Sequence, residues 1–72
     1  MATRFYFHLV KGQQRIPDRI GALVSPEVVT SSAVLDVAKD IWPGLGDSVA
    51  WAGWSIEICD ATGNVVRVIA LV

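Results

Sequence analysis

The sequence predicts an α+β fold with the element order ββαββ: a four-stranded, mainly antiparallel sheet with one helix packed on one face. Three observations support this prediction: an alternating segment at residues 4–10, a punctuated apolar segment at residues 25–44, and two apolar runs around a turn at residues 60–64. The chain of 72 residues suffices for one domain, residues 1–72, which buries only about 60 % of its unfolded surface. We therefore expect a thin stability margin.

The first strand is predicted from "RFYFHLV", residues 4–10, in which side chains alternate between two faces. The inner positions are apolar: Phe5, Phe7 and Leu9. The outer positions are Arg4, Tyr6 and His8. A half-buried strand shows this pattern, so the single histidine is expected to occupy the outer side of a central strand.

A hairpin follows the first strand, because Gly12 tolerates the positive φ that a two-residue turn at residues 11–12 requires. This turn predicts two cross-strand pairs: Phe7 with Ile16, and His8 with Arg15. Pro17 has no backbone donor and therefore confines the second strand to an edge of the sheet.

One helix is predicted between Ser25 and Pro43. Ser25 suits the N-cap, Pro26 the first helical position, and Glu27 the positive end of the helix dipole. Pro43 and Gly44 end the helix.

The predicted helix has a wide apolar arc. Its polar residues form one narrow stripe: Ser32, Asp36, Lys39 and Asp40. Its apolar residues spread over roughly 220°, whereas about 100° is enough to cover a sheet. They are Val28, Ala33, Val34, Leu35, Val37, Ala38, Ile41 and Trp42. The following loop is expected to cover part of this surplus with Leu45, Val49, Trp51 and Trp54, which leaves the rest for an interface.

The last segment predicts a hairpin. Asp60 suits the first position of a type I turn, and Gly63 suits the left-handed position after it. On the core face this register pairs Ile58 with Val66, Ile56 with Val68, and Trp54 with Ala70. On the outer face it pairs Glu57 with Arg67, and Cys59 with Val65. Two strand orders remain open: 2-1-3-4, which is wholly antiparallel, and 2-1-4-3, in which the central pair is parallel. The first is preferred.

Several of these segments resemble a family of small bacterial proteins known as a domain of unknown function. The residues that carry the resemblance are "RFYFH" near the start, then Gly12, Asp18 and Gly21, and "WSIEICDATGNVV" near the end. The resemblance spans nearly the whole chain. The helix departs from the family pattern, which is rich in Ala and Glu. The resemblance implies a cytoplasmic fold with no established activity, cofactor or partner.

The composition narrows the classes of function. A net charge of −1 and a pI of 5.6 argue against a general nucleic-acid-binding surface. The single cysteine, Cys59, excludes an internal disulfide, and one Cys with one His cannot complete a zinc site without acidic ligands or a partner chain. We expect no metal and no cofactor. No secretory signal and no membrane-spanning run are visible, so the sequence predicts a cytoplasmic protein.

Self-association is the expected way to cover the apolar surface, because 53 % of the residues are hydrophobic and the mean hydropathy is +0.49. The leading hypothesis is a non-enzymatic interaction module that acts as a homodimer. The candidate binding or interface face consists of Arg4, Tyr6, His8, Arg15, Glu57, Cys59 and Arg67. The alternative is that this outer face binds a small ligand or single-stranded nucleic acid. Catalysis by His8 with Cys59 is the least favoured hypothesis, because an open sheet face excludes no water.

Overall fold

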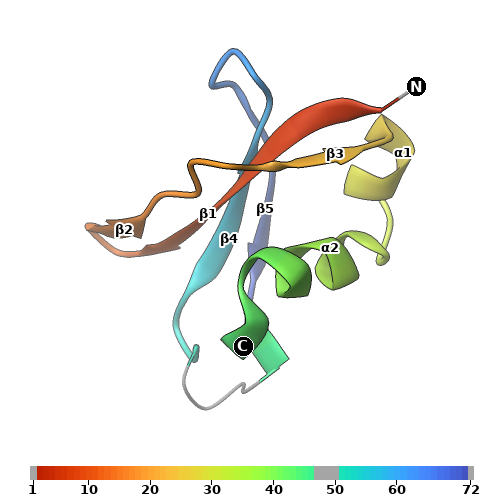
Figure 1. The fold of residues 1–72 in the computed structure, drawn as a ribbon. Coiled ribbons are helices and arrows are strands. Elements are labelled where there is room, and N and C mark those ends of the chain that lie inside the picture. The colour runs from red at the N-terminus through yellow and green to blue at the C-terminus, as the bar shows by residue number, and fades with distance from the viewer. Residues whose placement is uncertain (1, 47–50, 72) are drawn as a thin grey trace.

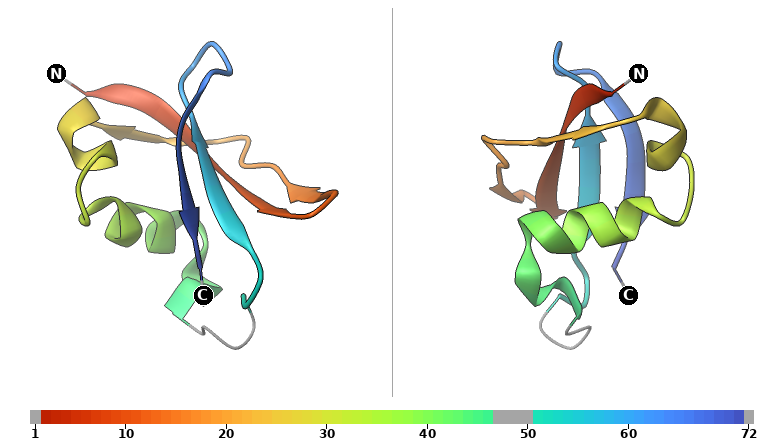
Figure 2. Two further views of the ribbon diagram at one scale, coloured as in Figure 1. Left: turned by 180° about the vertical axis from the view of Figure 1, so that it is seen from behind. Right: turned by 45° about the vertical axis from the view of Figure 1, so that its right-hand side comes forward.

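The computed structural model describes residues 2–46 and 51–71, and it has an antiparallel sheet with helices on one face (Figure 1). The elements are β1 (Thr3–Lys11), β2 (Gln14–Ile16), β3 (Ala22–Val24), α1 (Pro26–Val29), α2 (Val34–Ile41), the 3-10 helix η1 (Pro43–Gly46), β4 (Ser55–Cys59) and β5 (Val65–Ala70). The right-hand view of Figure 2 shows α2 lying across the sheet. The predicted α+β class is confirmed. No helix in the described ranges is long and apolar enough to cross a membrane.

The main strand order is β2-β1-β4-β5, which is the preferred all-antiparallel order 2-1-3-4 of the four expected strands. β3 was not expected, and it pairs with β1. β1 is therefore the central strand, with β4 on one edge and with β2 and β3 on the other. The alternation of faces in β1 is confirmed, because Phe5, Phe7 and Leu9 are buried.

The predicted register of the first hairpin is wrong by two residues. The observed pairs are Leu9 with Ile16, Val10 with Arg15, and Lys11 with Gln14. The turn therefore consists of Gly12 and Gln13, and Gly12 alone has a positive φ, 57°. A type II′ turn needs glycine at its first central position, and this preference sets the register.

The predicted register of the last hairpin holds only next to its turn, where Cys59 pairs with Val65. The pairing then shifts by one residue between Ile58 and Cys59, because a β-bulge adds one residue on the β5 side. Ile58 therefore faces Arg67. Because side chains alternate with a period of two, this shift exchanges the two faces of β5. Val66 and Val68 are consequently exposed, at 47 % and 58 %, rather than lining the core.

Arg67 lies on the helix side of the sheet and not on the outer face where the sequence placed it. Its Nη1 donates hydrogen bonds to the carbonyl oxygens of Val29, at 2.6 Å, and Ser31, at 3.0 Å. The predicted pair between Glu57 and Arg67 is therefore wrong.

The single predicted helix is broken into α1 and α2 at residues 30–33. The hydroxyl groups of Thr30 and Ser31 donate to the carbonyl oxygens of Glu27 and Val28, at 3.0 and 2.9 Å. These side chains compete with the backbone donors that would continue the helix. Arg67 binds two carbonyls at the same break, so the end of α1 is satisfied by side chains rather than by another helical turn.

The core lies between the sheet and the two helices. Its buried hydrophobic members are Phe5, Phe7, Leu9, Val29, Val34, Ala38, Ile56 and Ile58. Leu45, Trp51 and Trp54 pack against this cluster, as expected of the loop that follows α2. Val49, which was expected to join them, lies outside the described residues.

Candidate functional site

The sheet has a gap in the hydrogen-bond ladder along one edge of β1. The pairs that flank the gap are Leu9 with Ile16 in β2 and Phe5 with Ala22 in β3. Residues 17–21 therefore face residues 6–8 of β1 without strand pairing, although the chain continues in the same direction. The backbone groups of Phe7 on this edge need partners other than a strand, because Phe7 is fully buried.

The carboxylate of Asp18 supplies one of these partners. Its Oδ2 accepts the backbone N–H of Phe7 at 3.0 Å, and its Oδ1 accepts those of Ile20 and Gly21 at 3.1 and 3.0 Å. Asp18 is only 7 % exposed. A carboxylate thus replaces strand pairing at the gap and fixes the turn that leads into β3.

The indole of Trp42, at the end of α2, supplies the other partner. Its Nε1–H donates to the carbonyl oxygen of Phe7 at 2.7 Å. The two backbone groups of Phe7 are therefore satisfied by side chains from two distant segments. This arrangement ties the end of α2 to the centre of the sheet.

His8 secures the same segment from the outer side. Its Nδ1 accepts the backbone N–H of Asp18 at 3.0 Å, so the imidazole is neutral and carries its proton on Nε2. Burial lowers the pKa of His8 below its ordinary value, and Arg15 lowers it further, against opposing effects of Asp18 and Glu57. The ring is stacked parallel to that of Tyr6, with 6.4 Å between centroids. His8 is a structural acceptor in this arrangement.

Arg4 and Gly21 complete the attachment of residues 17–21. The Nη1 of Arg4 donates to the carbonyl oxygen of Ile20 at 2.6 Å. Gly21 has a φ of 71°, and a Cβ there would lie 2.6 Å from the carbonyl oxygen of Phe5. Only glycine fits at this position without a shift of the backbone. Four residues that carry the family resemblance thus act on one short segment: Arg4, His8, Asp18 and Gly21.

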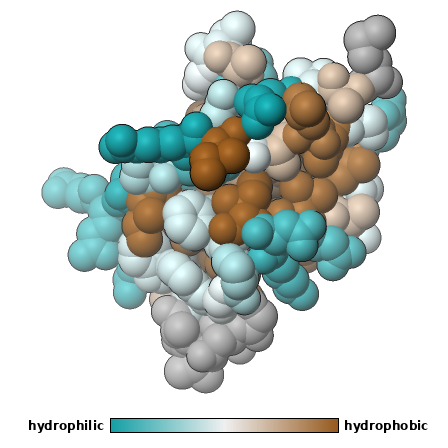
Figure 3. Space-filling view, in the orientation of Figure 1, coloured by the Kyte–Doolittle hydropathy of each residue, from teal (hydrophilic) through white to brown (hydrophobic). Residues whose placement is uncertain are grey.

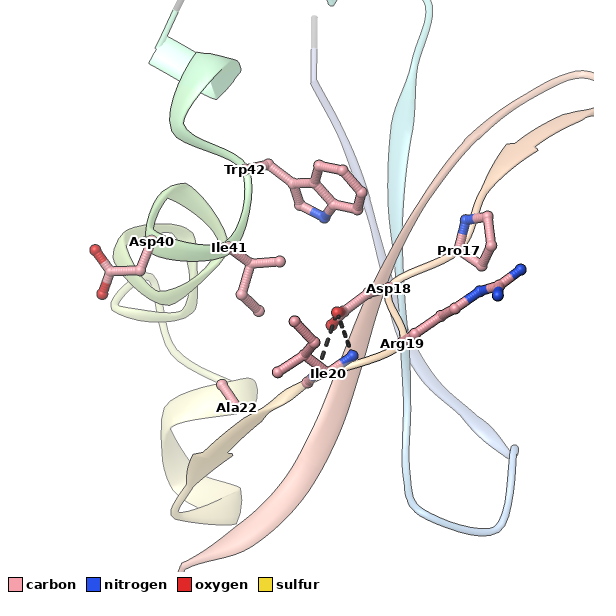
Figure 4. Close-up of a pocket in the computed structure, with 9 residues that line it drawn as sticks. Pro17, Asp18, Arg19, Ile20, Ala22, Asp40, Ile41 and Trp42 are labelled. Atoms are coloured by element: carbon pink, nitrogen blue, oxygen red, sulfur yellow. Dashed lines mark hydrogen bonds between the residues drawn. The ribbon is translucent and has the colours of Figure 1, made fainter.

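A cavity of about 620 Å³ opens beside this gap, between residues 17–22 and the end of α2. Figure 3 shows hydrophobic surface between β3 and the polar side of α2. Figure 4 shows the side chains of Ile20, Ile41 and Trp42 around the cavity, with the carboxylate of Asp18 on the side formed by residues 17–22. The same view shows Arg19 and Asp40 directed away from it.

The predicted outer face is brought together only in part. Arg15 and Glu57 form an ion pair of 2.7 Å, and His8 lies opposite Glu57. Cys59 lies opposite Tyr6, and its Sγ is 3.8 Å from Oε1 of Glu57. Burial and the charge of Glu57 raise the pKa of the Cys59 thiol, which disfavours a thiolate nucleophile.

The structure does not place all seven predicted residues on one face. Arg67 is on the opposite side of the sheet, and Arg4 is bound to the carbonyl of Ile20. Among residues 2–46 and 51–71, no group of three His, Cys, Asp or Glu side chains could hold a metal ion.

Sequence reasoning missed the cavity and the part played by Asp18 and Trp42. A signal was present at residues 17–21, "PDRIG", where Asp followed by a glycine three residues later is typical of a side chain that caps a turn. The contact of Trp42 with Phe7 had no local signal, because it joins residues 35 positions apart.

Comparison with known proteins gives one match. Residues 4–72 match the family described as Domain of unknown function (DUF6894), whereas no curated protein and no solved structure matches. The matched range includes β1, the gap with its cavity, both helices and the closing hairpin. The chain therefore belongs to the DUF6894 family of domains of unknown function.

Proposed function

We propose that this domain is a non-enzymatic interaction module that acts as a homodimer, joined along the open edge of β5. The observation that supports this proposal is an apolar edge strand without an exposed charge. β5 ends the strand order, and its side chains Val65, Val66 and Val68 are 53 %, 47 % and 58 % exposed. A long apolar edge strand is a template for pairing with another strand.

The backbone of β5 offers hydrogen bonds at this edge. The N–H of Leu71 donates to the carbonyl oxygen of Trp54 at 2.9 Å, so the backbone groups of Leu71 face β4. Backbone groups alternate in direction along an antiparallel strand, and those of Val68 and Ala70 therefore face outward. They can pair with an equivalent strand.

Arg67 does not protect this edge. Soluble proteins commonly place charged side chains on edge strands to prevent pairing. Arg67 is the only charged residue of β5, and its guanidinium is bound to the carbonyls of Val29 and Ser31 beneath the sheet. The outer side of β5 is consequently left apolar.

The sequence of β5 is self-complementary in a two-fold arrangement. If Val68 faces its own copy, Val66 faces Ala70 of the other chain, and Arg67 faces Ile69 rather than a second Arg67. This register joins two sheets without opposing like charges. The other edge strands, β2 and β3, have three residues each and therefore offer fewer backbone hydrogen bonds to a partner strand.

The alternative, nucleic-acid or small-ligand binding on the outer face, has less support. All three arginines proposed for that face are already bound. Arg15 forms an ion pair with Glu57, Arg4 donates to the carbonyl oxygen of Ile20, and Arg67 donates to a backbone carbonyl on the helix side of the sheet. Phosphate recognition depends on available cationic side chains.

Sedimentation of the chain at micromolar concentration tests the proposal. We expect twice the monomer mass of 7.8 kDa. Val68→Lys should give the monomer, because two lysines would then face each other in the pair. Leu23→Lys is the matched control, since Leu23 is an equally exposed apolar residue on the edge strand β3.

A monomeric wild-type chain contradicts self-association. Loss of the dimer in Leu23→Lys, with the dimer retained in Val68→Lys, contradicts the assignment to β5. Circular dichroism of both variants confirms that they are folded before their masses are compared.

A further inference from the structure

We propose that the cavity between residues 17–22 and the end of α2 binds a small organic cation with an apolar body, such as an amine, through Asp18 and Trp42. The proposal concerns the opposite side of the sheet from the outer face, and it does not depend on dimerisation. Three properties of the cavity support it: its charge, its free hydrogen-bonding capacity and its walls.

The cavity lining includes three charged residues, Asp18, Arg19 and Asp40, and Asp18 is the one whose side chain is not directed away from the cavity. Asp18 is 7 % exposed, and its three hydrogen-bond donors are neutral backbone N–H groups. The ion pair within the described ranges is that of Arg15 with Glu57, and Asp18 has no such partner there. Figure 4 shows the Arg19 side chain pointing away from the cavity. A buried charge is costly without a counter-charge, so a cation is the complementary ligand.

The hydrogen-bonding capacity of the carboxylate also selects a donor. Two carboxylate oxygens offer about four acceptor positions. Oδ1 of Asp18 accepts two N–H groups and Oδ2 accepts one, so one position remains on Oδ2. The Nε1–H of Trp42 is already given to Phe7, and it is not free to bind an anion.

The walls of the cavity fit an apolar body. Its volume of about 620 Å³ lies in the range of small-molecule sites, about 300–1,000 Å³. Ile20 is a large apolar residue at the cavity that is 80 % exposed, and Ile41 faces it from α2. The indole of Trp42 adds an aromatic surface, which attracts cations as well as apolar groups.

The test is a titration of the isotope-labelled protein, followed through the backbone amide signals of Phe7, Ile20 and Gly21 by NMR. The probes are benzylamine, the neutral benzyl alcohol and the anionic benzoate, which share one ring. We expect benzylamine to bind on the order of tenfold more tightly than benzyl alcohol, because a charge-assisted hydrogen bond replaces a neutral one. Benzoate should not shift these signals.

Two variants make the test specific to the cavity. Ile20→Lys places a tethered ammonium at the cavity and should abolish the shifts caused by benzylamine. Leu23→Lys adds the same charge at an exposed apolar position outside the cavity lining and should leave them unchanged. Both replaced side chains are exposed, so both variants are expected to fold.

Three results overturn the proposal. They are no shift with benzylamine, equal affinity for benzylamine and benzyl alcohol, and unchanged binding by Ile20→Lys.

A lysine side chain of a partner presents the same chemistry as a free amine. N-acetyl-lysine methylamide is therefore a second probe, and its tighter binding assigns the cation to a protein partner, whereas tighter binding of benzylamine assigns it to a free small molecule.

Discussion

His8 and Asp18 hold two segments together by reciprocal hydrogen bonds. The imidazole Nδ1 of His8 accepts the backbone N–H of Asp18, and the carboxylate of Asp18 accepts the backbone N–H of Phe7, each at 3.0 Å. These two bonds attach residues 17–21 to the centre of β1, where strand pairing is missing. The histidine lies on the outer side of its strand, as the sequence predicted, and its specific role is to fix residues 17–21.

The first prediction is that the domain loses stability as the pH falls below 6.5. The folded-state pKa of His8 is lowered from its ordinary value of 6.5, chiefly by burial, so the unfolded chain binds more protons in this range. Its contribution to stability is therefore present above pH 6.5 and is lost as the pH falls through the folded-state pKa. Thermal unfolding measured between pH 5 and 7.5 (roughly the range over which a histidine titrates) checks this.

His8→Asn is the control for the first prediction. The Oδ1 of asparagine can accept the Asp18 N–H from nearly the same position, but it does not titrate. We expect a smaller decrease of the melting temperature on acidification in this variant. An identical decrease in both proteins would show that another group is responsible.

The second prediction concerns Asp18. Asp18→Ala should lower the free energy of unfolding by ~3 kcal/mol or more, because three N–H groups lose their acceptor, including the buried one of Phe7. Asp18→Asn should cost less, since its Oδ1 can still accept the N–H groups of Ile20 and Gly21. Urea denaturation followed by tryptophan fluorescence measures both. A change below about 0.5 kcal/mol in Asp18→Ala would contradict the assigned role.

Much of the fold could be predicted because its signals are local. The alternation of residues 4–10 gave the buried face of β1, and Pro17 indicated the short edge strand β2. The bulge in β5 had no comparable signal: five of its six residues are apolar, and the hydrophobic pattern favoured the register that keeps Arg67 on the outer face, which the structure does not adopt. Arg67 could reach the carbonyls at the end of α1 only once that helix was broken.

The candidate site was harder to predict than the fold. β3, with three residues, is too short for a period-two pattern to be recognised. The site also depends on contacts between distant segments, such as Trp42 with Phe7, which no local pattern encodes. Asp18 was predicted only as part of the family resemblance, and the turn signal in residues 17–21 was not used. Neither feature shows that a gap in the sheet needs its carboxylate.

The third prediction compares two glycines with positive φ. Gly21→Ala should cost ~2 kcal/mol or more, because the new Cβ would meet the Phe5 carbonyl oxygen at 2.6 Å as well as bearing the strain of a φ of 71°. Gly12→Ala should cost only about 1 kcal/mol, since its φ is 57° but no atom lies within 4 Å of the added Cβ. Equal losses of unfolding free energy would contradict the close approach at Gly21.

The fourth prediction tests the corrected faces of β5 with double-mutant cycles. Glu57 should couple to Arg15 by about 0.2–1 kcal/mol and less at high salt, because their ion pair is partly exposed. Glu57 should not couple to Arg67, whose guanidinium is bound to carbonyls on the helix side. Arg67→Met alone should nevertheless cost about 1–2 kcal/mol through the loss of those hydrogen bonds. Chemical denaturation of the single and double variants gives each coupling energy, and a coupling to Arg67 as large as that to Arg15 would return Arg67 to the outer face.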